Sequence, residues 1–168
     1  MLPPQPQFPF DDQTWIISDT HFFHENIGRY CDRPDGWQET IIANWNHHIQ
    51  PEEIAFHVGD LALGKRENIE GLAPLLNGKL YLIRGNHDRR SNGFYQRLGI
   101  TLVHDPYRRD HPSGWTLIFS HRPISPLCRE CSTFTDTSTT VQLPNWEPGT
   151  STFAWRLEII VRGGLAKF

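Results

Sequence analysis

The sequence has few cysteines, no long apolar run and little net charge, and each shortage narrows the class of protein. It has three Cys in 168 residues, an odd number that does not form the paired framework of a small disulfide-rich domain. No apolar stretch approaches the roughly 20 residues of a membrane-spanning helix. The first residues lack the basic and apolar regions of a secretory signal peptide. We therefore expect a cytoplasmic globular protein that does not engage a membrane.

Basic residues do not outnumber acidic ones. The chain has 16 Lys and Arg against 19 Asp and Glu, a net charge of −3 with histidine neutral. A general nucleic-acid binder normally carries a basic stripe, whereas Arg89-Arg90 and Arg108-Arg109 are isolated pairs. The balance disfavours a polynucleotide partner, and composition does not indicate an oligomeric state.

Strand and helix patterns alternate along the chain. Four short apolar runs, each ending in polar residues, are typical of buried strands; they lie at residues 15–19, 54–60, 80–88 and 115–121. Between them, apolar residues recur with helical spacing near residues 41–49, 69–76 and 94–98. The alternation predicts an α/β domain over residues 14–127, after a Pro- and Gln-rich leader at 1–13. Residues 128–168 form an atypical Ser- and Thr-rich tail.

Polar residues that can bind metals follow all four predicted strands. In α/β sheets, functional sites assemble in the loops beyond the carboxyl ends of the strands. The four loops contain Asp19-Thr20-His21, Gly59-Asp60, Gly85-Asn86-His87-Asp88 and Ser120-His121. Mixed carboxylate, amide and imidazole ligands favour Mn²⁺, Fe or Zn over a metal selected by thiolates.

Each motif alone has an ordinary structural reading. Asp19-Thr20-His21 occurs in many surface turns, His87 fits a hydrogen-bonded loop histidine, and Asp60 could cap a helix near residues 65–76. Four such motifs in this order, each after its own apolar run, are not explained by caps and turns. We therefore interpret them together as one metal site.

The ordered motifs resemble the calcineurin-like metallophosphoesterases. The segment Ile17–Ile27, which reads Ile-Ser-Asp-Thr-His-Phe-Phe-His-Glu-Asn-Ile, is similar to small bacterial and phage phosphoesterases of that superfamily. The resemblance covers roughly residues 14–127. It implies a sandwich of two mixed β-sheets flanked by helices, with the C-terminal part incomplete here.

The resemblance also implies a role for each motif residue. Asp19 and His21 would hold a first metal, and Asp60 would bridge both metals. Asn86 and His121 would hold the second. The metals would be two divalent ions, Mn²⁺ foremost, with Fe, Zn or Ni as alternatives.

The implied chemistry is hydrolysis of a small phosphate ester, either a monoester or a diester. A two-metal centre activates a water and clamps the attacking and leaving oxygens. His87 would act as proton donor or electrostatic stabiliser at the phosphate, and Asp88 would orient His87. His24 and Arg89 are candidates for contacting the phosphate or leaving group, and surface polarity explains them equally well. The other histidines are interpreted as structural: His47, His48, His57, His104 and His111.

One motif of the family has no counterpart here. The family's last motif, Gly-His-x-His, supplies one ligand to each metal, and no histidine follows His121. Codons for Cys131–Thr140 can be chosen so that a reading frame shifted one base earlier encodes a different peptide. With the frame starting at the last G of a GAG codon for Glu130, that peptide is Val-Leu-Asn-Ile-His-Gly-His-Ile-His-Asp. We hypothesise that the chain is frameshifted near residue 127. The alternative is a natural, divergent Ser/Thr-rich tail.

Three functions remain open at this point. The first is a phosphoesterase with weak metal binding and low or no turnover in this chain. The second is a catalytically dead metal-binding or interaction module. The third is a nuclease, which the net charge disfavours.

Overall fold

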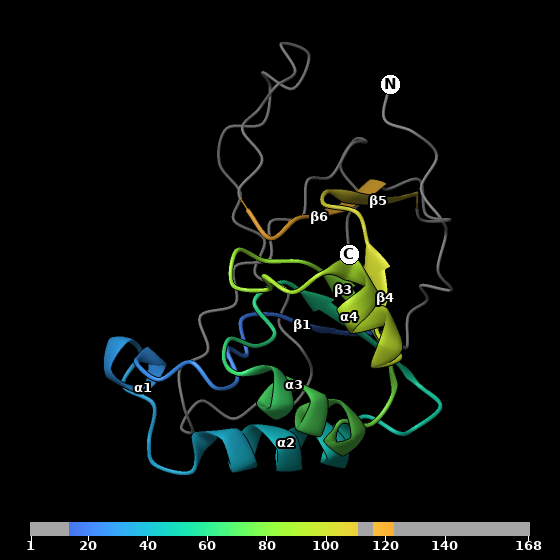
Figure 1. Ribbon diagram of the computed structural model, residues 1–168. Coiled ribbons are helices and arrows are strands. Elements are labelled where there is room, and N and C mark those ends of the chain that lie inside the picture. The colour runs from blue at the N-terminus through green and yellow to red at the C-terminus, as the bar shows by residue number, and fades with distance from the viewer. Residues whose placement is uncertain (1–13, 111–115, 123–168) are drawn as a thin grey trace, which may run out of the picture.

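The computed structural model describes residues 14–110 and 116–122, which form three layers (Figure 1). Helices form one outer layer, a parallel sheet lies in the middle, and a pair of antiparallel strands forms the other outer layer. The predicted leader at 1–13 and tail at 128–168 lie outside the described residues.

The middle layer is a four-stranded sheet in the order β1-β2-β3-β4. Its strands are β1 (Trp15–Ile17), β2 (Ile54–Val58), β3 (Lys79–Ile83) and β4 (Thr101–Val103). All three pairings are parallel. The first three strands confirm the strands predicted from the apolar runs. The sequence did not predict β4, whose three residues are too few to show a period.

Helices connect the parallel strands. They are α1 (Ile27–Tyr30), α2 (Trp37–His48), α3 (Arg66–Leu72), a 3₁₀ turn (Ala73–Leu75) and α4 (Asn92–Arg97). The helical spacing correctly predicted α2, α3 with its 3₁₀ turn, and α4. Gly78 follows the 3₁₀ turn at φ 91°, where the chain turns into β3 and a glycine is favoured.

Side chains alternate between the two faces of the sheet, because successive strand residues point in opposite directions. On β2, Ala55 belongs to a core cluster packed against residues of the helices, such as Trp45. Its neighbour Phe56 belongs to a second cluster with Tyr107 and Phe119. Burial on both faces explains why these strands read as continuous apolar runs.

The second cluster joins the sheet to β5 (Tyr107–Asp110) and β6 (Thr116–Phe119), which pair antiparallel. The predicted fourth strand therefore exists, but it pairs with β5 and not with the parallel sheet. The α/β class and the helix-flanked sheet are confirmed. Within the described residues each sheet has one kind of pairing, so the expected mixing of pairings is not found there.

No helix among residues 14–110 and 116–122 combines the length and apolar character that crossing a bilayer requires. Because β1 to β4 are parallel, their carboxyl ends share one edge of the sheet. The loops after β1, β2 and β3 leave from that edge.

Candidate metal centre

The loops after β1 and β2 run side by side and continue the pairing of the two strands. Asp19 N donates to Gly59 O at 3.0 Å, and His21 N donates to Asp60 O at 2.9 Å. Further on, Phe22 forms an isolated parallel bridge with Ala62. This pairing places Asp19 and His21 directly beside Asp60.

Left-handed backbone conformations recur at this edge of the sheet. Asp19 has φ 55°, His21 has φ 53°, Asp60 has φ 57° and Gly59 has φ 91°. Each non-glycine residue in this region costs about 1–3 kcal/mol and persists only where its surroundings hold it. Such conformations cluster at functional sites. Here they coincide with three of the residues predicted as metal ligands.

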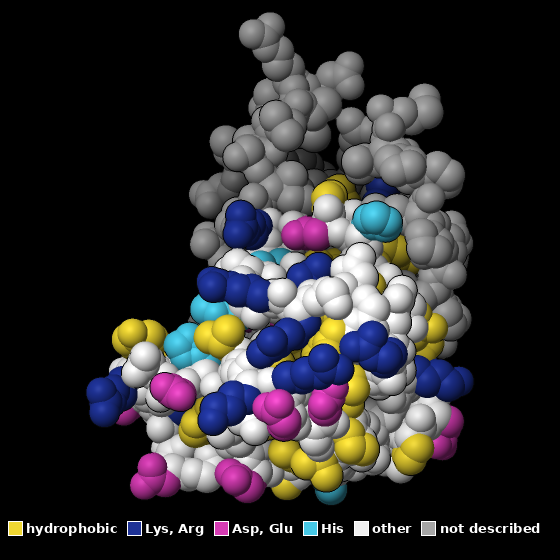
Figure 2. Space-filling view, in the orientation of Figure 1, with side chains coloured by type: hydrophobic (Ala, Val, Ile, Leu, Met, Phe, Trp, Pro, Cys, Tyr) yellow, Lys and Arg dark blue, Asp and Glu magenta, His cyan; other side chains and the backbone are white. Residues whose placement is uncertain are grey.

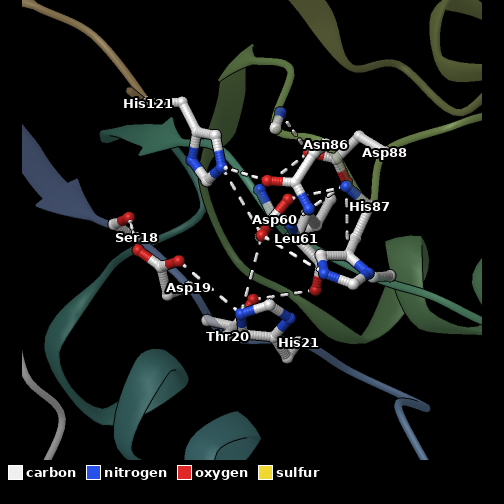
Figure 3. Close-up of polar contacts among 12 residues, drawn as sticks. Ser18, Asp19, Thr20, His21, Asp60, Leu61, Asn86, His87, Asp88 and His121 are labelled. Carbon is white, nitrogen blue, oxygen red and sulfur yellow. Dashed lines mark hydrogen bonds and ion pairs between the residues drawn. The ribbon is translucent and has the colours of Figure 1, made fainter. Parts of the chain in front are cut away.

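Asp60 lies at the centre of the cluster (Figure 3). Its Oδ2 lies 3.5 Å from His121 Nε2, 3.7 Å from His21 Nε2 and 3.9 Å from His87 Nε2. These separations are too long for hydrogen bonds. Ligand atoms that share a cation at about 2.1 Å lie roughly 3–3.5 Å apart. The arrangement is therefore close to that of a ligand set around a cation.

The second carboxylate oxygen of Asp60 has a different partner. Oδ1 accepts a hydrogen bond from His87 N at 2.8 Å. This contact fixes the carboxylate and leaves Oδ2 directed toward the imidazoles. Asp60 is 4% exposed, and a carboxylate so buried requires positive charge nearby. The capping alternative does not apply, because α3 begins after Lys65 and not after Asp60.

His121 supplies a direct argument for a cation. Its Nδ1 lies 3.1 Å from the Val58 carbonyl oxygen, so this nitrogen carries the proton in the neutral ring. The Nε2 lone pair then faces two further acceptors, Asn86 Oδ1 at 3.2 Å and Asp60 Oδ2 at 3.5 Å. With the ring neutral, a cation placed among these three atoms would satisfy all of them. A backbone carbonyl behind a ligating imidazole is a common feature of metal sites.

Two glycines allow the loops to approach so closely. A Cβ on Gly59 would lie 2.2 Å from His121 Nδ1, and a Cβ on Gly85 would lie 2.1 Å from Asp60 Oδ1. No side chain fits at either position without moving a proposed ligand. The glycines next to Asp60 and Asn86 are therefore part of the site.

Asp19 faces His21 from the end of β1. Asp19 Oδ1 lies 3.6 Å from His21 Nε2, and Asp19 Oδ2 accepts a short hydrogen bond from Ser18 Oγ. Burial raises the pKa of Asp19, but the contacts with His21 and Ser18 and the charge of His121 outweigh it, so the net pKa is lowered. Asp19 is therefore held in the ionised form that binds cations.

Asp88 is buried, at 1% exposed, and joins the two central loops through backbone amides. Its Oδ2 accepts from Asp60 N and Gly85 N, both at 2.8 Å. Its Oδ1 accepts from Leu61 N at 3.1 Å and from Ala62 N at 3.4 Å. Burial raises its pKa, partly offset by these amides. The carboxylate fixes the loop that carries Asp60.

The expected contact between Asp88 and the His87 ring is not found among the described residues. His87 Nδ1 is buried there without a hydrogen-bond partner, while both carboxylate oxygens of Asp88 bind backbone amides. The reason is the turn at residues 85–88, in which Asp88 N donates to Gly85 O at 3.3 Å. This turn directs the Asp88 carboxylate inward and leaves the His87 ring beside Asp60. Among the described residues, the Asp88 carboxylate holds the loop of Asp60 and makes no hydrogen bond with the His87 ring.

Three imidazoles form a second group of potential ligands: His21, His24 and His87. Their ring centroids lie 5.1–5.6 Å apart, and the Nδ1 atom of each is buried without a partner among the described residues. Burial, then the charges of His21 and His87, lower the pKa of His24. The first group of potential ligands is Asp19, His21 and Asp60. His21 belongs to both.

His57, on β2, supports the loop that carries Asp19 and His21, a role that the sequence analysis missed. Its Nε2 lies 3.0 Å from Thr20 Oγ1, which donates to Leu61 O at 2.9 Å. The histidine is fully buried, and burial lowers its pKa to about 3. A polar residue within the apolar run of β2 was the available signal. Among the described residues, His47, His48 and His104 are absent from the groups of potential ligands, and His111 lies outside those residues.

Arg33 also holds the loop after β1. Its guanidinium donates to Thr20 O at 2.6 Å and to Asp19 O at 3.0 Å. It lies 4.5 Å from the centre of the Trp37 ring, a cation–π contact that fixes its plane. No sequence pattern indicated this role. Arg89, in contrast, is exposed, and its Nε donates to Asn86 O at 3.1 Å.

The predicted ligands thus come together. Asp19, His21, Asp60, Asn86 and His121 surround one region, and His87 and His24 lie beside it. The donors are carboxylate, amide and imidazole groups, which fit Mn²⁺, Fe or Zn. The structure therefore presents a candidate centre for divalent cations.

Comparisons with known proteins agree with this geometry. The chain is 38% identical over 115 residues to the uncharacterized protein MJ1445 of Methanocaldococcus jannaschii, covering 62% of each chain. Its fold is similar to the crystal structure of a protein of unknown function, AQ665, from Aquifex aeolicus. The TM-score is 0.55 at 26% identity, over 68% of this chain and 63% of that one.

The chain spans less than two thirds of the length of both relatives. The sequence model described as calcineurin-like phosphoesterase matches residues 13–149, which is most of the chain. On this match, and with the ligand set assembled as described, the chain belongs to the calcineurin-like phosphoesterase family.

Proposed function

We propose that this chain is a metal-dependent phosphoesterase by descent, acting on small phosphate esters with two divalent cations. The observation that carries the proposal is the environment of Asp60 Oδ2. Three imidazole nitrogens face it at 3.5–3.9 Å, too far for hydrogen bonds and near the spacing of ligands that share a cation.

Asp19 and His21 would hold the first cation, Asn86 and His121 the second, and Asp60 both. When bound, such cations neutralise charge on the phosphate and make a water a better nucleophile. Mn²⁺ is the proposed metal, with Fe, Zn or Ni as alternatives. A cytoplasmic location is proposed with it.

His87 is the proposed proton donor. Its backbone N–H is held by Asp60 Oδ1 at 2.8 Å, and its ring lies at the edge of the ligand set, with Nε2 3.9 Å from Asp60 Oδ2. An imidazole at this position can donate a proton to a departing alkoxide. His24, whose ring centroid lies 5.2 Å from that of His87, and Arg89, which lines a pocket with His87, would bind oxygens of the phosphate or leaving group.

We also propose that the tail is frameshifted near residue 127. The family's Gly-His-x-His is missing from the chain, so each cation would lack one imidazole. The family match extends to residue 149, past that point, which favours the alternative of a natural, divergent tail. The encoding DNA is the direct test. The third bases of the codons for Cys131–Thr140 must be those that encode the missing histidines in the shifted frame. Other third bases would eliminate the hypothesis.

The test of function is hydrolysis of bis-p-nitrophenyl phosphate with Mn²⁺, comparing this chain with a frame-restored chain. Loss of a ligand or its support commonly costs about 10–100-fold, so we expect clear turnover from the restored chain and little or none from this one. D60N in the restored chain is the control that removes the proposed bridging ligand.

Two outcomes would change the proposal. Equal turnover by both chains would show that the Gly-His-x-His ligands are dispensable and that the ligand assignments need revision. Saturable Mn²⁺ binding without turnover by either chain would favour the alternative, a catalytically dead metal-binding module, which the missing motif supports.

A further inference from the structure

A pocket of about 240 Å³ adjoins the candidate centre at His87. Its lining contains His87 and two arginines, Arg89 and Arg90. His87 therefore belongs both to the surroundings of Asp60 and to the pocket wall. A group leaving the phosphate next to His87 would have this pocket within reach.

The apolar part of the lining comes from the loop after β2 and from α3. It includes Leu63, which is half-buried, beside Ala62 and Ile69, which are buried. Apolar cavities of about 150 Å³ bind benzene in proteins, so the volume is sufficient for a single substituted ring. The pocket is open to an apolar body of that size.

The charged part of the lining is purely cationic. Arg90 donates to Gly64 O at 2.5 Å, and Arg89 donates through Nε to Asn86 O at 3.1 Å. These contacts fix the two guanidinium groups on the backbone and use few of the five N–H donors that each possesses. Within residues 14–110 and 116–122, neither arginine forms an ion pair with a carboxylate.

Basic residues are also found on the wider surface. Figure 2 shows Lys and Arg side chains gathered on the face formed by α3 and α4, with some Asp and Glu side chains among them. Arg66 and Arg84 lie there over the rings of Phe94 and Tyr95. Arg66 is paired with Glu70 at 2.8 Å, whereas Arg84, Arg89 and Arg90 form no ion pair with a carboxylate among the described residues, and their charge attracts anions toward the pocket.

We propose that this pocket is a leaving-group subsite that selects phosphate esters whose leaving group has a second anionic group on a small apolar body. Arg89 and Arg90 bind the second anion, while Leu63 contacts the apolar body. The inference rests on the proposed function. It adds Arg90 as a specificity-determining residue and names the substrate class.

The test compares two phosphonates that cannot be hydrolysed, phenylphosphonate and 4-carboxyphenylphosphonate. Their binding to the full chain is measured by calorimetry at saturating Mn²⁺. We expect the carboxylated probe to bind about tenfold more tightly, the effect of one charge-assisted contact. R89M/R90M should reduce that ratio to about one. R97M is the matched control, because Arg97 is exposed and does not line the pocket, and it should keep the preference.

The outcomes separate the subsite from the function on which it rests. Equal affinity for the two probes, with Mn²⁺-dependent binding of both, overturns the subsite and leaves the phosphoesterase proposal intact. A preference that survives in R89M/R90M also overturns the subsite. No Mn²⁺-dependent binding of phenylphosphonate overturns the proposed function, and the subsite with it.

Discussion

Replacing Asp88 with Asn tests whether this carboxylate holds the loop of Asp60. Both of its oxygens accept backbone hydrogen bonds, from Asp60 N and Gly85 N on one side and from Leu61 N and Ala62 N on the other. An Asn side chain keeps one acceptor and presents an NH₂ group in place of the other. Two of the four backbone amides then face a donor.

The magnitude follows from those contacts. A buried N–H without a partner costs about 1–3 kcal/mol, so two of them cost roughly 2–6 kcal/mol. Removing a buried carboxylate offsets part of this cost, because burial raises the pKa of Asp88. We therefore expect D88N to lower the free energy of unfolding by about 2–4 kcal/mol, a large share of the 5–15 kcal/mol typical of a domain.

The assay is urea denaturation without added metal, with D35N as the matched control because Asp35 is exposed. D35N should stay within about 0.5 kcal/mol of the parent chain. A second readout is Mn²⁺ affinity under folding conditions, which D88N should weaken by about 10–100-fold because Asp60 loses its support. A D88N variant with the stability and Mn²⁺ affinity of the parent would refute the positioning role.

Three further predictions concern the residues around the ligands. Burial lowers the pKa of His57 to about 3, so below its ordinary pKa the unfolded chain takes up a proton that the folded chain does not. The free energy of unfolding should therefore fall by about 1.4 kcal/mol per pH unit as the pH drops from about 6.5 toward 4. H57Q should lose this contribution to the slope in denaturation at several pH values, and an unchanged slope would contradict the assignment. R33M should raise the Mn²⁺ dissociation constant about tenfold in calorimetry, because two carbonyls of the ligand loop lose their donor; exposed Arg29 gives the control R29M, and equal affinities would exclude the role of Arg33. G85A should weaken Mn²⁺ binding by at least about tenfold, since its Cβ would lie 2.1 Å from Asp60 Oδ1. A Cβ on Gly71 would meet no atom within 4 Å. The control G71A should therefore keep Mn²⁺ affinity while stabilising α3 by about 0.5–1 kcal/mol.

The sequence was most informative where strand geometry alone decides placement. Parallel strands bring their carboxyl ends to one edge, so Asp19, His21 and Asp60 could be expected to meet once three apolar runs were recognised. His121 was harder to place, because its strand pairs with β5 and reaches the site from a second sheet. The motif order and family resemblance identified it, whereas its strand pairing could not have done so.

The supporting contacts were not predictable in the same way. The family resemblance implied that Asp88 orients His87, but a carboxylate binds wherever buried amides converge. Those amides belong to residues 60–62 and 85, and their convergence depends on the fold. Arg33 donates to the backbone carbonyls of Asp19 and Thr20. A sequence does not indicate which backbone carbonyls will accept such hydrogen bonds.

The measurement that tests the central claim most directly is calorimetric titration of Mn²⁺ into this chain and into D60N. The account predicts saturable binding to the parent chain, weaker than to a frame-restored chain, and its loss in D60N, because Asp60 Oδ2 faces His21, His87 and His121. Equal Mn²⁺ affinity in the parent chain and D60N would contradict the account, since the cation would then bind away from the residues that the fold brings together.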